Sequence, residues 1–251
     1  MAVMDEFKEE REAIKSAPFS KKVEYFWDYY RIHTIAAILI VGFIGSFIYT
    51  YATKTDTILY GTLINCSITD EGITNLENAY YEAMGTDLGA ESITLDTSMY
   101  LDYITQDYNH SINQQKLVVL MAAGEIDFYA GDEYTIAEIA YDGGLVDLRT
   151  VLSNEEIAMY EEYFMYIDEK VVEEIELLMD DTSVEYVQPE LSYGSAEDME
   201  SPVPVAIYIQ DNTILGENVT FIDEPAVIGI SPNSSRIEET ITYLNLLLEI
   251  E

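Results

Sequence analysis

The sequence predicts an α/β domain, with helices on both faces of a mixed or mostly parallel sheet, behind a single transmembrane helix. Three observations support this fold class. An uncharged and mostly apolar stretch occupies residues 34–53. Beyond it, β-rich runs alternate with amphipathic helical patterns, as in proteins built from strand–helix–strand units. Charge is also unevenly placed, because 41 of the 48 acidic residues follow residue 50, whereas six of the 11 basic residues precede it.

The uncharged stretch has the length and composition of a membrane-spanning helix. Twenty helical residues reach about 30 Å, which matches the hydrocarbon thickness of a bilayer. Aromatic residues flank the stretch at 25–30 and again at Tyr49 and Tyr51, and such rings favour the headgroup region. We therefore expect a cytoplasmic arm at 1–32, a transmembrane helix at 33–53 and an outer domain at 57–251.

The basic residues predict the orientation of this span. Six of them precede it and only Lys54 follows it closely. By the positive-inside rule, the N-terminus lies in the cytoplasm and the C-terminal domain is extracellular. A cleaved signal peptide is disfavoured, since the polar start is long and no A-x-A site follows. A buried core helix is disfavoured because an all-round apolar stretch of this length has aromatic belts on both sides.

The outer domain contains five runs with the composition of strands. They are Thr57–Cys66, Ser92–Leu95, Ile126–Ala130, Pro204–Ile209 and Ala226–Ile230. Capping residues and apolar stripes predict helices between the first of these strands. The predicted helices run from Thr69 or Asp70 to Gly85, from Ser111 or Asn113 to Gly124, and from Asp132 to Gly143 or Gly144.

The middle of the outer domain has a different pattern, with two helices in succession. Ser153 and Glu156 have the spacing of a capping box, and the apolar positions that follow extend to Phe164. A second amphipathic helix is expected over 171–179, where apolar positions alternate with outward glutamates.

A polar stretch then separates this region from the last strands. Gln188–Ser201 is the best candidate for an internal linker, and a small inserted lobe is expected at about 149–202. The chain closes with a predicted helix capped by Ser235, with Glu238 in the capping-box position.

Composition excludes several classes of function. A net charge of −37 argues against binding nucleic acid, because phosphate contacts need clustered Lys and Arg. Cys66, the single cysteine, excludes an intramolecular disulfide and is expected to be an inert thiol at the end of a strand. His33 is expected at the membrane boundary and His110 in a surface loop. We expect no catalytic residues, no metal site and no cofactor, since no ligand cluster or phosphate loop occurs.

One segment resembles a known family. Within Lys116–Leu148, the turn Ala122–Glu125, the strand start Asp127 and the end Gly144–Leu148 resemble extracytoplasmic solute-binding proteins of the type II periplasmic-binding-protein-like class. Val227–Ser231 and the helix after it are similar to that family's late strand and C-terminal helix. The resemblance implies a solute-binding fold with a small second lobe, since the outer domain is shorter than complete two-lobed members. The residues before the span resemble the juxtamembrane segment of uncharacterised Gram-positive membrane proteins.

Candidate ligand residues follow from the placement of strand ends. In open α/β sheets, crevices form beyond the carboxyl ends of the strands. Asn65, Ser67 and Ser98 would supply hydrogen bonds there, Asp132 would accept from a hydroxyl or amine, and Tyr134 would stack on a ring. Each also has a structural explanation, with Asp132 as a helix cap, Ser98 as a turn residue and Tyr134 as packing.

These features together predict a membrane-anchored extracellular binding module that is not an enzyme. The acidic domain favours a small neutral or cationic ligand over an anion. The alternative is a structural or assembly subunit of a cell-envelope complex, in which a degenerate binding fold docks a protein partner. An enzyme would need a polar cluster that converges on His110 or Cys66.

Overall fold

The computed structural model forms two compact units, one at Met1–Lys54 and one at Thr55–Glu251. The structure describes residues 14–53, 56–84, 91–180 and 187–249.

The first unit is dominated by one long helix, α2 (Phe19–Ala52). Its segment Tyr30–Ala52 has a mean hydropathy of 2.1, and none of the residues in its most apolar window is buried within the protein. Among the described residues, this is the one helix long and apolar enough to cross a membrane, and it contains most of the span expected at 33–53. The chain therefore has a candidate single-pass membrane anchor near its N-terminus.

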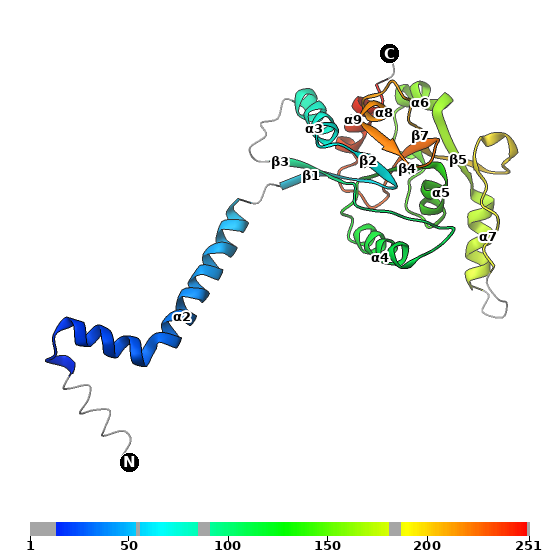
Figure 1. Ribbon diagram of the computed structural model, residues 1–251. Coiled ribbons are helices and arrows are strands. Elements are labelled where there is room, and N and C mark those ends of the chain that lie inside the picture. The colour runs from blue at the N-terminus through cyan, green and yellow to red at the C-terminus, as the bar shows by residue number, and fades with distance from the viewer. Residues whose placement is uncertain (1–13, 54–55, 85–90, 181–186, 250–251) are drawn as a thin grey trace. The chain divides into compact units, whose positions relative to one another are not determined.

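The second unit is built on a mixed sheet of seven strands (Figure 1). In spatial order the strands are β3 (Glu91–Asp96), β1 (Asp56–Leu63), β4 (Phe128–Asp132), β9 (Ala226–Ile230), β7 (Pro202–Tyr208), β5 (Phe164–Asp168) and β6 (Tyr193–Gly194). β1 is parallel to both β3 and β4, and each later neighbour pair is antiparallel. A second, two-stranded sheet pairs β2 (Cys66–Ile68) with β8 (Val219–Phe221).

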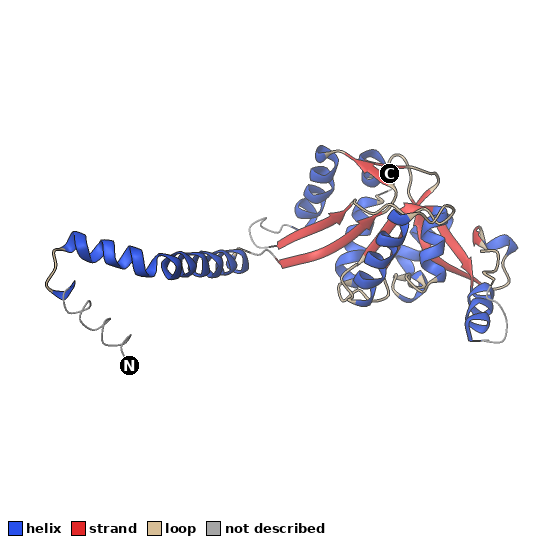
Figure 2. Cartoon of the chain, turned by 60° about the horizontal axis from the view of Figure 1, so that its bottom comes forward, coloured by secondary structure: helices blue, strands red, loops and turns tan. Residues whose placement is uncertain are grey.

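Helices cover both faces of the large sheet, as Figure 2 shows. One buried cluster joins the sheet to α3 (Asp70–Met84), α6 (Asn154–Tyr160), α8 (Ile214–Asn218) and α9 (Ile237–Leu247). The other joins it to α4 (Tyr108–Ala122), α5 (Glu133–Tyr141) and α7 (Glu169–Asp180). The α/β class, with helices on both faces of the sheet, is thus confirmed.

The first predicted strand is in fact two. β1 ends at Leu63 and β2 starts at Cys66, because Asn65 between them has a φ of 53°. This left-handed conformation is one that asparagine tolerates and that no strand can continue through. The chain turns there, so β2 leaves the large sheet and pairs with β8.

The start predicted for α4 is also wrong. The helix begins at Tyr108, before either Ser111 or Asn113, because the Asp107 carboxylate accepts a hydrogen bond from the amide of His110 at 2.8 Å. Its predicted end is confirmed, since Gly124 has a φ of 66° just after the last turn.

The middle of the domain contains a strand that the periodicity did not predict. The capping box of Ser153 and Glu156 is confirmed, but the helix it opens ends at Tyr160. Phe164 starts strand β5, which pairs with β7. Pairing with a strand distant in sequence decides the conformation of such a short apolar run, which a local pattern cannot reveal.

The stretch expected as a linker and small lobe also contributes to the sheet. β5 and β6 both lie within 149–202 and extend the sheet at one edge. The cap predicted for the last helix is wrong, because α9 begins after Arg236 and Ser235 does not cap it. The Ser234 hydroxyl instead accepts from the amide of Arg236 at 3.0 Å.

Candidate binding site

Two of the predicted site residues form a buried clamp at the carboxyl ends of β1 and β4. The Asn65 amide nitrogen donates to the carbonyl of Leu101 at 2.8 Å, to the Asp132 carboxylate at 3.0 Å and to the Thr135 hydroxyl at 3.1 Å. Its oxygen accepts from the amide of Leu101 at 2.8 Å. The second Asp132 oxygen caps α5 by accepting from the amide of Thr135 at 2.9 Å. The polar groups of this Asn65–Asp132 clamp are therefore used within the protein.

Ser67 and Ser98 lie apart from this clamp. Ser67 is an exposed residue of β2 opposite Thr220, at the edge of a separate hollow of about 400 Å³. Ser98 follows β3, where its hydroxyl donates to the Asp96 carboxylate at 2.6 Å and accepts from Lys116 at 3.1 Å. The five predicted residues therefore do not converge on one cavity.

Tyr134 lines a cavity of about 390 Å³ just beyond the clamp. Tyr103, from the loop after β3, and Tyr193, from β6, contribute two more rings to its walls. The ring centroids of Tyr134 and Tyr103 are 6.3 Å apart at 84°, and those of Tyr134 and Tyr193 are 6.1 Å apart at 49°. Rings inclined in this way form the walls of a concave site, which we call the tyrosine cavity.

The remaining lining of the tyrosine cavity is mixed, with two glutamines and two glutamates beside Pro189 and Leu191. Glu138, one turn after Tyr134 on α5, is only 9% exposed. Its carboxylate accepts a hydrogen bond from the Gln188 side chain at 3.2 Å. Gln188 belongs to the loop before β6, whose residues 188–191 close one side of the cavity. The site thus combines three phenol rings with a buried carboxylate.

The protein environment raises the pKa values of Tyr134, Tyr103 and Asp142. Burial raises the pKa of Tyr134 to about 12, and its hydrogen bond to Glu138 adds to this effect. Burial likewise raises the pKa of Tyr103, together with the charges of Asp142 and Glu138. Desolvation and then the Glu138 charge raise the pKa of Asp142. Each phenol therefore stays neutral at physiological pH.

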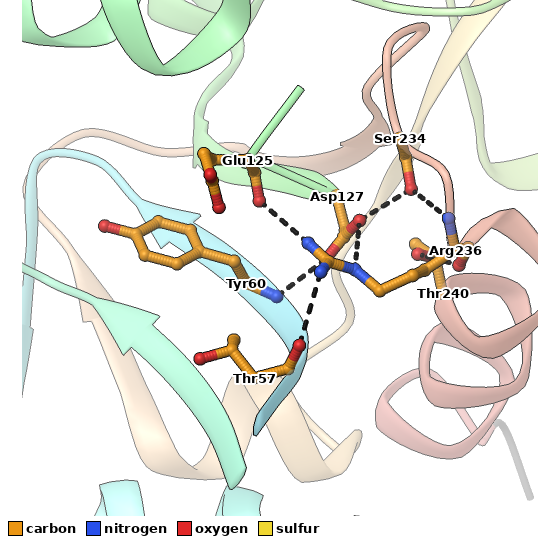
Figure 3. A network of polar contacts seen from close by, with 7 residues as sticks. All are labelled: Thr57, Tyr60, Glu125, Asp127, Ser234, Arg236 and Thr240. Atoms are coloured by element: carbon orange, nitrogen blue, oxygen red, sulfur yellow. Dashed lines mark hydrogen bonds and ion pairs between the residues drawn. The ribbon is translucent and has the colours of Figure 1, made fainter. Parts of the chain in front are cut away.

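A different polar network occupies the amino ends of the strands (Figure 3). Asp127, just before β4, is completely buried and accepts from the amide of Tyr60 at 2.7 Å and from the Ser234 hydroxyl at 2.6 Å. The Arg236 Nε lies 2.9 Å from one Asp127 oxygen and 3.1 Å from the other. The Arg236 guanidinium also donates to the carbonyl of Thr57 at 3.3 Å and to that of Glu125 at 3.0 Å. This Asp127–Arg236 network ties β1, β4 and α9 together.

Neither His110 nor Cys66, the two residues considered as catalytic centres, belongs to a polar network of this kind. His110 is 3% exposed within α4, so the expected surface loop position is wrong, and its ring packs edge-on against Tyr103 at 4.9 Å. Burial and the charge of Asp96 raise the pKa of Cys66 to about 11, which keeps it a protonated thiol at neutral pH. Within the described residues, no three His, Cys, Asp or Glu side chains are placed to hold a metal ion.

Sequence reasoning identified one wall of the tyrosine cavity and missed the others. Tyr134 and Glu138 are four residues apart on a helix that was predicted, so their common face could have been inferred. Tyr103 and Tyr193 lie in a loop and a two-residue strand, about 90 residues apart in the chain. Nothing in the local sequence marks either of them as neighbours of Tyr134.

Comparisons of the chain with known protein families, with curated proteins and with solved structures each find no match.

Proposed function

We propose that this chain is a membrane-anchored binding module whose C-terminal domain lies outside the cell and holds a small neutral or cationic ligand in the tyrosine cavity. The observation that carries the proposal is the cavity itself, formed by Tyr103, Tyr134, Tyr193 and Glu138 beyond the carboxyl ends of the strands. Ligand sites in open α/β sheets form at this position. A volume of about 390 Å³ suits a small molecule.

The proposed location rests on α2 and on charge. The segment Tyr30–Ala52 is long and apolar enough to span a bilayer; five basic residues precede it and Arg31 lies at its start. An extracellular domain with four basic and 41 acidic residues repels anions and attracts cations. Protease treatment of intact cells tests the orientation, since the C-terminal domain should be digested from outside.

We propose kinship with solute-binding proteins that have a small second lobe. The basis is the similarity of the segment Lys116–Leu148 and of the last strand and helix. Parallel pairing of β1 with β3 and β4 supports it, as do the helices on both faces of the sheet. The raised pKa of Cys66 and the packed ring of His110 favour binding over catalysis.

A thermal-shift screen of the full-length chain in nanodiscs tests the binding function. The panel should contain sugars, short peptides, amino acids, polyamines and quaternary ammonium compounds. We expect stabilisation by at least one class, which the Tyr134→Leu variant should lose and the Tyr100→Leu variant, at an exposed tyrosine outside the cavity, should keep. The absence of stabilisation by every class would contradict the proposal.

The alternative is an assembly subunit of a cell-envelope complex, and one surface favours it. Tyr108, Ile112 and Val119 lie along one face of α4 and are all exposed, with Val119 at 66%. An apolar stripe of this kind suits a protein partner. Crosslinking in native membranes, with Val119→Lys as the disrupting variant, would identify a stoichiometric partner if this alternative holds.

A further inference from the structure

Glu138 has no counter-ion among the described residues of the C-terminal domain. Burial of a carboxylate is costly unless an opposite charge lies against it. Among the described residues, the side chains that hydrogen-bond to Glu138 are the Gln188 amide and the Tyr134 hydroxyl, and both are neutral. Asp142, at the C-cap of α5, adds a second negative charge to this environment.

The described Lys and Arg side chains of the domain are all paired with carboxylates other than Glu138. The Lys and Arg side chains of residues 56–249 that the structure describes form four ion pairs. These are Lys116 with Asp96, Arg149 with Asp147, Lys170 with Glu173 and Arg236 with Asp127. The tyrosine cavity is lined by none of these cations. A cation that balances Glu138 therefore has to come from outside the described residues of this domain.

The walls of the cavity favour an organic cation. Tyrosine faces attract ammonium groups, more strongly where the site is desolvated, and an attached alkyl group gains from contact with the apolar rings. A metal ion would prefer several oxygen ligands, and the described residues contain no such cluster. A neutral sugar would stack on the rings and leave Glu138 unbalanced.

Building on the proposed binding function, we infer that the tyrosine cavity is selective for organic ammonium ions, held between the rings of Tyr103, Tyr134 and Tyr193 with Glu138 as the counter-ion. The rings provide the affinity for the alkyl or methyl groups of the ligand. The Glu138 carboxylate provides the preference for positive charge over an equally shaped neutral molecule.

The test compares two probes of the same shape and different charge. Choline and 3,3-dimethylbutan-1-ol differ in having nitrogen or carbon at the branched centre, so only choline is a cation. Isothermal titration of the full-length chain in nanodiscs, at low salt, should show choline binding at least tenfold more tightly. Putrescine serves as a second cation, with primary rather than quaternary ammonium groups.

Variants separate the cavity from the acidic surface as a whole. Glu138→Gln should weaken choline binding at least tenfold and bring the two probes closer together, whereas Glu155→Gln, at an exposed glutamate of α6, should change neither. Tyr134→Leu should weaken choline binding and Tyr134→Phe should preserve it, because the ring and not the hydroxyl contacts the cation.

The possible results distinguish the inference of cation selectivity from the proposed binding function. If the neutral probe binds as tightly as choline, or if only neutral compounds from the broader screen bind, the inference of cation selectivity fails and the binding function stands. If choline binds but Tyr134→Leu and Glu138→Gln bind it unchanged, the cation is held by the general acidic surface and the inference again fails. If no compound binds, both proposals fail.

Discussion

The two ends of the central sheet bury carboxylates in different ways. At the amino ends of β1 and β4, Asp127 is wholly enclosed and is paired with Arg236 as well as with two neutral donors. At the carboxyl ends, Glu138 is nearly as buried but is contacted by neutral donors only. Asp127 joins three parts of the chain, whereas Glu138 opens onto a cavity.

This difference teaches how to separate structural from functional polar groups in one fold. A buried charge that is fully paired has its electrostatic partner inside the protein, so its loss should be felt as lost stability. A buried charge without a partner costs stability as it stands, and this cost is the reason that a cationic ligand is proposed for Glu138. Residues at the two ends of the sheet are expected to differ in their effect on the free energy of unfolding.

The largest effect is expected at the Asp127–Arg236 network. Arg236→Met leaves Asp127 buried and without its cation, and should lower the free energy of unfolding by about 3–5 kcal/mol. Urea denaturation measures this. Lys170→Met is the matched control, because its ion pair with Glu173 is about half exposed on both sides, and screening by solvent leaves it little effect on stability. Equal losses of stability in the two variants would mean that the buried Asp127–Arg236 pair contributes no more than the exposed pair.

The next largest effect is expected at the Asn65–Asp132 clamp. Asn65→Gly keeps the left-handed backbone and removes the hydrogen bonds to Leu101, Asp132 and Thr135, at a cost of about 2–3 kcal/mol. Asn65→Ala should cost about 1 kcal/mol more, since alanine is strained at a positive φ. The same denaturation measurement compares the two variants. If alanine proves no worse than glycine, the backbone strain assigned to this turn is incorrect.

A smaller, pH-dependent effect is expected at Asp96, at the carboxyl end of β3. Burial alone would raise its pKa, but hydrogen bonds from Lys116 and Ser98 outweigh burial and lower the pKa to about 2. A depressed pKa stabilises the fold above the unfolded value near 4, and this contribution is lost as the pH falls through 2. Because Lys116 is partly exposed, solvent screening limits the contribution to about 1 kcal/mol.

The measurement for Asp96 is the difference in stability between the wild-type chain and Asp96→Asn at several pH values. That difference should be about 1 kcal/mol at pH 6 and should close between pH 4 and pH 2. A difference that persists unchanged at pH 2 would mean that the Asp96 charge is not its source.

The smallest effect on stability is expected at Glu138. Glu138→Gln removes an unbalanced buried charge and keeps a similar shape, so the free energy of unfolding should change by less than about 1 kcal/mol, in the stabilising direction. Thermal unfolding at pH 7 without added ligand measures it. A loss as large as that of Arg236→Met would show that Glu138 is structural, like Asp127, and would contradict its assignment as a ligand group.

Local patterns predicted most helices because caps act within one turn. Asp132 caps α5 and Ser153 opens α6 as expected, since each accepts from an amide three residues later. β5 was missed because its conformation depends on pairing with β7, about 40 residues away. Short apolar runs do not distinguish a strand from a helix without that partner.

The same limit applies to the candidate site. Asn65 and Asp132 were expected at the strand ends and do lie there, but the sequence contains no sign that they would bind each other. Their hydrogen bond joins residues 67 positions apart. Tyr134 lines a cavity as expected of a ligand residue, while the rings around it come from segments that meet only in the folded domain.

What the sequence determined by itself was the apolar span, the division of charge around residue 50, the α/β class and the local caps, because each depends on composition or on contacts within a few residues. The tertiary structure alone decided that Asp127 would meet Arg236 and that Glu138 would meet none of the described cations of its own domain. The physical reason is the distance along the sequence over which each interaction acts. Helix caps and membrane length are set along the chain, whereas the pairing of a buried charge depends on which distant segments pack against it.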